Sequence, residues 1–549
     1  MSSRLEALPP ELRDRVVDYI ANPSDLRALC LTSRTLRAHA MPAMYRKVEA
    51  KIDVACGLTE DGKTYTGLLS PKHPGLRYLR ELRLETRYTG IVVDDAKTVA
   101  RILKALPKKT LRHFGCKNLM VNEEAIMALF TKQGKLTSLE LGPISFNLAL
   151  FVKSGMLGAT QCQTLTALSI PKLLGSATDL DFYQQVIENA PLKSLSIHTK
   201  RYYGDTKEAT QFNADGGHEE LVSTLFSHIA NNPSAKPLEL ETLVMKDFDF
   251  HVPKGVLPKY INLCLLQRIE LHRCPEAGNF VKILTSKFKK HGTALETFEY
   301  VRAEGDTLGS KATEHFLLSF SGLKRLVLIG FDGVDGYQGL DESVLQKHGD
   351  TLEELILHPE GFGNLACDEM GVKPDFFVAM AKYCTKLRQL GITMPIIHTQ
   401  GSTPEETGEY METFRDIFSL TDLKALRIFN WPYLWPGFFA KVPNGAEDGH
   451  IAKLNEVAFC THMDWYVQKC LVKFFEEFHE GNKSPVFCFA GVDGDHISDG
   501  RRTLVYKPTA SYVPIKKMDI FDQKQTVLEK VNTSDVKFFE PESGVLSWP

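Results

Sequence analysis

The stretch Leu323-Lys-Arg-Leu326-Val-Leu328-Ile-Gly-Phe331 has the form L-x-x-L-x-L followed by a turn, and this spacing recurs along most of the 549-residue chain. On a strand, Leu326 and Leu328 point to the same face because they are two residues apart, and Leu323 reaches the same core from the preceding turn. We call such a set an apolar triplet. Twelve further triplets have this spacing: Leu79/Leu82/Leu84, Leu111/Phe114/Cys116, Leu136/Leu139/Leu141, Leu165/Leu168/Ile170, Leu192/Leu195/Ile197, Leu240/Leu243/Met245, Leu266/Ile269/Leu271, Leu295/Phe298/Tyr300, Leu352/Leu355/Leu357, Leu387/Leu390/Ile392, Leu423/Leu426/Ile428 and Leu454/Val457/Phe459.

The thirteen triplets recur about every 31 residues, and helical patterns such as residues 280–288 and 376–383 lie between them. Strands joined through short helical crossovers pair in parallel. One strand–helix pair cannot bury its own apolar face, so the pattern predicts an α/β solenoid with a continuous core. The triplet resembles the leucine-rich repeat family. That resemblance implies a horseshoe of about 13–14 repeats, with the parallel sheet on the concave face and helices on the convex face.

Composition limits the classes of partner and compartment. The formal net charge is −3 with both signs interspersed, so we expect neither a nucleic-acid nor a membrane partner. The eleven cysteines lack paired spacing, which is typical of reduced thiols. We find no signal-peptide pattern at the start and no run of about 18 apolar residues, and therefore expect an intracellular protein, cytoplasmic or nuclear.

Residues 1–50 do not follow the triplet pattern and instead predict three short helices. Leu8-Pro9-Pro10-Glu11-Leu12 places prolines at a helix start, where the fixed φ is favourable. Asn22-Pro23-Ser24-Asp25 ends that helix and caps the second one. Ser33 can cap a third helix that runs towards Met41 and is closed by Pro42.

This segment resembles an F-box, a helical module that binds the Skp-family adaptor of cullin–RING ubiquitin ligases. The resemblance rests on Leu8-Pro9-x-Glu11-Leu12, Val16, Ile20, Asp25-Leu26-x2-Leu29-x-Leu31, Arg34 and Tyr45-Arg46-Lys47-Val48. It implies that the adaptor contacts Leu8, Pro9, Leu12, Val16, Leu26 and Leu29. A different interpretation is a helical cap that seals the open end of a solenoid scaffold with no ligase role.

The chain is therefore expected to comprise an F-box-like module (1–50), a joining segment with a first edge strand at 46–52 (51–75), the solenoid (76–483) and a β-rich cap (484–549). A short helical turn is expected at 65–69, and a long amphipathic helix at 464–480. Residues 485–491 predict a fourteenth strand, and 503–506, 513–515 and 536–539 predict strands that cover the last repeat. We expect a rigid joint between module and solenoid.

Alternation along the strands also predicts an open face of the sheet. Its residues are mostly polar in the first half and become apolar at Val327, Ile329, Ile356 and Phe429. The loop that follows carries Trp431, Tyr433 and Trp435, so we expect these seven residues to bind the target protein. The loop could instead fold down as a hydrophobic cover. Four insertions, at 199–217, 302–311, 361–375 and 394–410, are expected to line one rim.

The sequence offers no catalytic, cofactor-binding or metal-binding motif. Asp493-Gly-Asp495 lacks the companion ligands of a calcium loop and predicts a hairpin turn. His198, His272 and His358 are expected as solvated residues on the open face. The resemblance therefore implies a non-catalytic substrate receptor of a ubiquitin ligase. The alternatives are an interaction scaffold and an enzyme regulator such as a GTPase-activating repeat protein, which would need an arginine on an exposed loop.

Overall fold

The structure is a computed structural model of the chain. It describes residues 5–20, 23–53, 57–60, 63–64, 72–86, 96–117, 119–142, 162–173, 177–199, 217–232, 234–250, 257–303, 309–330, 340–358, 374–392, 408–428, 472, 486–489, 511–518 and 524–531. The chain divides into two compact units, Met1–Leu266 and Gln267–Pro549, called here the N-terminal unit and the C-terminal unit. Each is described separately.

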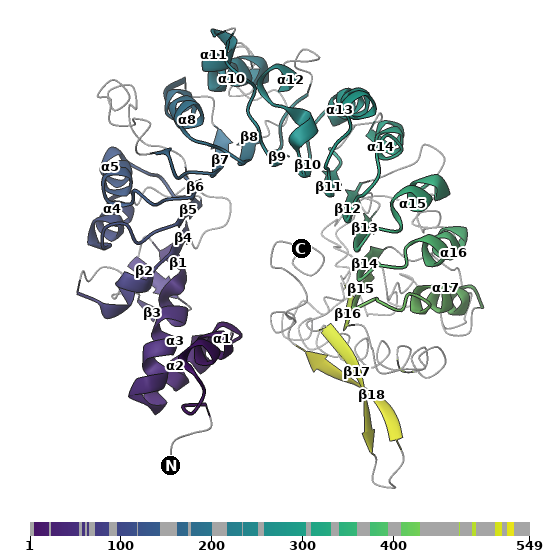
Figure 1. The fold of residues 1–549 in the computed structure, drawn as a ribbon, viewed down its shortest axis with the longest axis horizontal. Coiled ribbons are helices and arrows are strands. Elements are labelled where there is room, and N and C mark those ends of the chain that lie inside the picture. The colour runs from purple at the N-terminus through teal and green to yellow at the C-terminus, as the bar shows by residue number, and fades with distance from the viewer. Residues whose placement is uncertain are drawn as a thin grey trace, which may run out of the picture. The chain divides into compact units, whose positions relative to one another are not determined.

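The chain begins with a module of three helices, α1 (Pro10–Asp18), α2 (Pro23–Thr32) and α3 (Arg34–Arg46), as predicted (Figure 1). Ser33 caps α3, because its hydroxyl accepts a hydrogen bond from the Leu36 amide. The predicted stop at Pro42 is wrong, since Pro42 lies inside α3. Ala43 and Met44, which follow it, pack on the core of the module, and this burial offsets the cost of a proline within a helix.

The module joins the rest of the N-terminal unit without a linker. Strand β1 (Lys47–Asp53) begins at the residue after α3. The Tyr45 ring packs edge-on to His73, 5.2 Å away, next to the 3₁₀ helix η2 (Pro74–Tyr78). It also covers Gly75 so closely that a Cβ there would lie 2.6 Å from the ring. A side chain at position 75 would therefore displace Tyr45 and disturb the joint.

A mostly parallel sheet runs through the N-terminal unit. Its strands are β1, β2 (Gly57–Glu60), β3 (Lys63–Thr64), β4 (Glu81–Thr86), β5 (His113–Lys117), β6 (Ser138–Glu140), β7 (Ala167–Leu173), β8 (Ser194–Thr199) and β9 (Thr242–Lys246). Pairing is parallel from β1 through β4 to β9 and antiparallel for β1–β2 and β2–β3. The predicted edge strand β1 is thus flanked on both sides. The segment 65–69 lies outside the described residues.

Helices alternate with the strands of this sheet, and α4, α5 and α8 lie along one side of it (Figure 1). The helices of the N-terminal unit beyond the module are α4 (Ala96–Ala105), α5 (Glu123–Lys132), α8 (Ala177–Asn189), α10 (Gly217–Leu225), α11 (Ser227–Ala230), α12 (Leu257–Tyr260), η2 and the 3₁₀ helix η3 (Leu263–Leu265).

The C-terminal unit repeats this architecture. Its strands are β10 (Arg268–His272), β11 (Thr297–Val301), β12 (Arg325–Ile329), β13 (Glu354–His358), β14 (Gln389–Ile392), β15 (Ala425–Ile428), β16 (Val486–Phe489), β17 (Ser511–Met518) and β18 (Lys524–Val531). Its helices are α13 (Ala277–His291), α14 (Gly309–Leu317), α15 (Glu342–His348), α16 (Pro374–Tyr383) and α17 (Gly408–Phe418). Pairing is parallel from β10 to β16 and antiparallel at β16–β17 and β17–β18.

Twelve of the thirteen apolar triplets lie within the described residues, and each of their side chains is at most 5% exposed. The same backbone bonds accompany successive triplets. The Arg112 carbonyl accepts the amides of Thr137 and Ser138, and the equivalent Glu353 carbonyl accepts those of Arg388 and Gln389. The described chain is therefore a solenoid-like α/β arrangement of parallel strands with intervening helices, as the spacing predicts. The triplet at Leu454 lies outside the described residues.

Two buried polar side chains join neighbouring strand–helix pairs in the same way. Gln133, just after α5, accepts the Thr110 and Leu111 amides through Oε1 and donates to the Pro107 carbonyl through Nε2. His348, at the end of α15, accepts the Leu323 amide through Nδ1 and donates to the Leu317 carbonyl through Nε2. Each side chain thus bonds to the amide of the first residue in the preceding triplet and to a backbone carbonyl at the end of the preceding helix.

The end of the chain agrees in part with expectation. The predicted fourteenth strand is β16, and β17 includes the predicted strand at 513–515 and pairs antiparallel with β16. Strand β18 was not predicted, and the expected elements at 464–480, 503–506 and 536–539 fall largely or entirely outside the described residues. Within the described part of the chain, no helix has the length and apolarity that a membrane span requires.

Candidate functional site

Helix α1 carries an exposed apolar stripe on the N-terminal module. Leu12, Val16 and Tyr19 follow one another at helical spacing and are 45%, 37% and 73% exposed. Pro9, just before α1, is also exposed, and Leu8 is half-buried. Large apolar side chains that share an exposed face are typical of a protein-binding surface. With the half-buried Leu29 of α2, five of the six predicted adaptor-binding residues are thus at least partly accessible.

The remaining predicted adaptor residue, Leu26, lies in the core of the module. Leu26 is buried with Val17 and Ala40, and the half-buried Leu29 packs against this cluster. We therefore correct the prediction for Leu26, because a side chain that holds the three helices together is not available to a partner in this conformation. Of the apolar residues of α2, Leu26 thus serves to fold the module, whereas Leu31 is 80% exposed.

The open face of the N-terminal sheet is accessible and polar. Arg83, His113 and Lys117 are exposed on adjacent strands, and Ser138 and Ser194 are half-buried. Surface ion pairs link neighbouring strands, such as Lys117 with Glu85 of β4 at 3.5 Å. This face therefore resembles a solvated surface, as its composition predicts.

The open face of the C-terminal sheet is different. Val327, Ile329 and Ile356 form a buried cluster with Val301 and are only 4%, 4% and 3% exposed. The prediction that these three residues face a target protein is therefore wrong for this conformation. They lie in register on adjacent strands, where their branched side chains pack against one another. The other predicted target residues, Phe429, Trp431, Tyr433 and Trp435, lie outside the described residues, as do most of the predicted rim insertions.

An ionic network adjoins this apolar cluster on strands β10 to β13. Arg325 places one guanidinium nitrogen 3.0 Å from Glu299 and the other 3.3 Å from Glu354. Arg268 contacts Glu270 at 2.6 Å, and its guanidinium is also 3.6 Å from Glu299. All three carboxylates belong to buried residues, so the arginines supply the charge compensation that burial demands.

A histidine completes the network. His272 Nε2 lies 3.4 Å from Glu270 Oε2 and 3.6 Å from Glu299 Oε2. Burial alone would raise the pKa of Glu299, but its contact with His272 and the positive charges of Arg325 and Arg268 outweigh it and lower that pKa. Glu299 is therefore held as an anion.

The spacing of the ligand atoms in this cluster meets one requirement of a metal site. One ligand atom each from Glu270, His272 and Glu299 lies within 4.8 Å of the others, a grouping that a divalent cation could bridge. However, the two arginines already face the Oε1 atoms of both glutamates and would repel a cation. The donor set fits an ionic network with the two arginines better than a metal site.

The three histidines expected to be solvated have charged neighbours instead. His272 belongs to the ionic network, and His198 contacts Asp247 at 2.9 Å. Burial, with the positive charge of Arg427, lowers the pKa of His358 to about 3, so this imidazole is neutral at physiological pH. Only for His272 are the partners a residue two positions away on the same strand, Glu270, and a residue of the neighbouring strand, Glu299.

Sequence reasoning missed Arg268, Glu270, Glu299, Arg325 and Glu354 as a group. The available signal was charged residues at flanking positions of four consecutive triplets, with Arg325 and Glu354 opposite each other in register. Strand pairing places these charged residues side by side, where their side chains come into contact.

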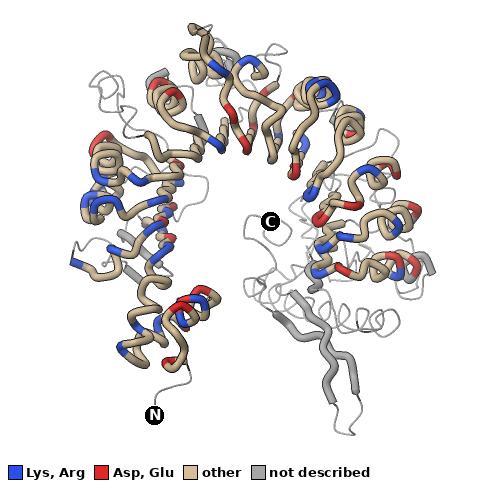
Figure 2. Tube along the Cα trace, viewed as in Figure 1, with Lys and Arg blue, Asp and Glu red and all other residues tan. Residues whose placement is uncertain are grey.

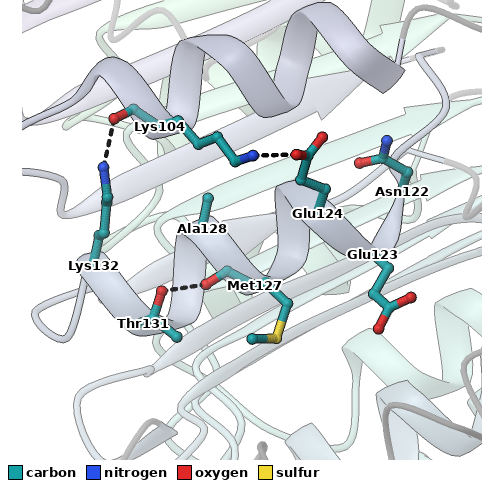
Figure 3. A pocket seen from close by; sticks show the side chains of 8 residues that line it. All are labelled: Lys104, Asn122, Glu123, Glu124, Met127, Ala128, Thr131 and Lys132. Atoms are coloured by element: carbon teal, nitrogen blue, oxygen red, sulfur yellow. Dashed lines mark hydrogen bonds and ion pairs between the residues drawn. The ribbon is translucent and has the colours of Figure 1, made fainter.

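A shallow groove of about 660 Å³ lies between α4 and α5 on the N-terminal unit (Figure 3). An ion pair between Lys104 and Glu124 crosses it, and the Lys132 ammonium donates to the Lys104 carbonyl. Met127 and Ala128 supply apolar lining. The polar groups of the groove bond mainly to one another or to nearby backbone, as Thr131 does to the Met127 carbonyl.

Known proteins provide no assignment for any of these surfaces. No protein-family model matches the chain, and no curated protein matches it at a significant level.

Proposed function

We propose that this chain is a non-catalytic substrate receptor of a cullin–RING ubiquitin ligase. The N-terminal module, which resembles an F-box, would bind a Skp-family adaptor, and the strand–helix units, as a leucine-rich-repeat horseshoe, would bind the target protein. Such a receptor performs no covalent step, because it accelerates ubiquitin transfer by holding the target close to the transferring enzyme.

The observation that carries this proposal is the exposed apolar stripe of α1. A three-helix module of about forty residues has little core of its own, so leaving Leu12 and Val16 exposed is unfavourable unless a partner covers them. Direct continuation of α3 into β1 supports the proposal, since a joint without a linker fixes the distance between the two binding surfaces.

The proposed target surface leaves out the three residues of the sequence expectation that are buried, Val327, Ile329 and Ile356. The open face of the N-terminal sheet, by contrast, exposes Arg83, His113 and Lys117. We therefore place target recognition on the N-terminal unit. Polar faces of this kind provide specificity through charge and hydrogen-bond complementarity.

Replacing Leu12 tests the proposal most directly. We expect Leu12→Asp to weaken binding of a purified Skp-family adaptor by about 100-fold or more, because it places a charge in an apolar contact. Isothermal titration calorimetry of the full chain measures this. Leu26→Asp is unsuitable, since a charge in the core would unfold the module.

Leu265→Asp is the matched control, because Leu265 is 42% exposed, close to the 45% of Leu12, and lies in η3 away from the module. We expect its adaptor affinity to equal that of the unmodified chain. If the unmodified chain does not bind the adaptor, or if both variants bind equally well, the ligase proposal fails and the helical-cap interpretation takes its place.

A further inference from the structure

Three turns of the N-terminal unit, leading into β4, β5 and β6, carry an unusual concentration of positive charge. Residues 72–80, 104–112 and 132–137, called here the basic turns, contain no aspartate or glutamate and nine cationic residues: Lys72, Arg77, Arg80, Lys104, Lys108, Lys109, Arg112, Lys132 and Lys135. Seven of the nine are exposed, and Arg80 and Lys132 are half-buried. Figure 2 shows Lys and Arg crowded around α4 and α5.

The basic turns are contiguous in space. The Lys109 amide donates to the Lys132 carbonyl at 2.7 Å, and the guanidinium of Arg80 donates to the Thr110 carbonyl at 3.4 Å. Arg112 donates to the Lys135 carbonyl at 3.5 Å. Backbone carbonyls thus orient the arginines without neutralising them, and the charges gather in one patch.

Equivalent turns elsewhere are arranged differently. In several later copies, the residue after the first apolar position of the triplet forms an ion pair with its counterpart in the next copy: Lys193–Glu241 at 3.3 Å, Glu296–Lys324 at 2.8 Å and Glu353–Arg388 at 3.5 Å. In the basic turns the same position holds Arg80, Arg112 and Thr137. Among the described residues, only Lys104 of the nine cations has a carboxylate within ion-pair distance.

Interaction with helix dipoles explains only part of this patch. Lys104 and Lys132 lie in the last turns of α4 and α5, where a cation is favourable. Lys108, Lys109, Arg112 and Lys135 lie beyond those turns, where this effect has fallen off. Their mutual repulsion remains uncompensated within the described residues and would be relieved by a bound anion.

We propose that the basic turns are a docking surface for an acidic segment of a partner protein. An extended polypeptide rises roughly 3.3 Å per residue, so its carboxylates can follow cations on turns spaced like neighbouring strands, about 4.8 Å apart. A net charge of −3 over the whole chain disfavours general attraction to nucleic acid or membrane. No exposed large apolar side chain lies within these turns to insert into a bilayer.

A labelled octaglutamate peptide tests this docking surface on the full chain by fluorescence anisotropy. We expect binding at about 50 mM salt that weakens at about 300 mM, because screening shortens the range of the charges. The double variant Lys108→Glu/Lys135→Glu should lose at least about tenfold in affinity. Neither side chain makes a hydrogen bond or ion pair within the described residues, so the fold should survive, as circular dichroism would show.

The matched control is Lys386→Glu/Lys424→Glu, which makes the same charge change on exposed lysines of equivalent turns in the C-terminal unit. It should bind the peptide with unchanged affinity. The proposal is overturned if the unmodified chain does not bind the peptide, or if both double variants lose affinity equally. Tighter binding to a 20-nucleotide RNA or to phosphatidylserine vesicles than to the peptide would also overturn it, in favour of that class of partner. Adaptor binding is a separate measurement, so either proposal can fail alone.

Discussion

Arg325→Met should destabilise the C-terminal unit by about 3–5 kcal/mol, the largest effect we expect from a single substitution that preserves side-chain length. The guanidinium contacts Glu299 and Glu354 together, and its side chain is only 12% exposed, against 9% for each carboxylate. Methionine fills most of the volume but leaves these buried charges undercompensated. Urea unfolding followed by circular dichroism measures the loss.

Lys324→Met provides the control on the adjacent residue. Lys324 pairs with Glu296 at 2.8 Å, yet both side chains are about half exposed, so solvent screens the pair. We expect no measurable change. Adding Glu299→Gln and Glu354→Gln to Arg325→Met should recover part of the loss, because both carboxylate charges are removed. Equal effects of the two methionine substitutions would show that the network is not buried enough to matter.

The strand positions could be predicted because burial of every second residue imposes a strict spacing. Leu323, Leu326 and Leu328 show this as clearly in the sequence as in the structure. Sequence signals for helix ends predicted the structure less well than this spacing did. Pro42 signals a helix end, but packing of Ala43 and Met44 prolongs α3 past it.

The accessibility of the open face could not be predicted in the same way. Alternation assigns Ile329 and Ile356 correctly to the face opposite the triplets, but says nothing about what else buries that face. Leu12 and Leu26 likewise have similar helical patterns, yet one is exposed and the other is core. Which apolar face of a small module is turned inward depends on the relative positions of its helices, and a single sequence does not specify them.

His348→Leu should cost about 2–5 kcal/mol, because it leaves two buried backbone groups without their partners. The ring accepts the Leu323 amide and donates to the Leu317 carbonyl, and His348 itself is 1% exposed. Leucine has similar volume but no polar atom. Hydrogen exchange measured by mass spectrometry should accelerate in peptides covering 309–330, while peptides covering 96–117 serve as an internal reference.

His348→Gln is the informative comparison, since Gln133 naturally makes the same pair of connections in the N-terminal unit. We expect it to retain most of the stability that leucine loses. If glutamine proves as destabilising as leucine, the two positions are not equivalent, and the aromatic contact of His348 with Phe320, 5.1 Å between centroids, carries the effect instead.

The same histidine should make the C-terminal unit sensitive to mild acid. Burial lowers the pKa of His348 from 6.5; the hydrogen bond to Leu317 opposes this and the charge of Lys347 reinforces it. Unfolded chains therefore bind a proton more readily, so the stability supplied by the neutral ring is complete above pH 6.5 and is lost as the pH falls towards the lowered pKa. Between pH 7 and 5 the unmodified chain should lose up to about 1.4 kcal/mol per pH unit more than His348→Gln. If the free energy of unfolding changes with pH in the same way in both proteins, His348 does not take up a proton on unfolding.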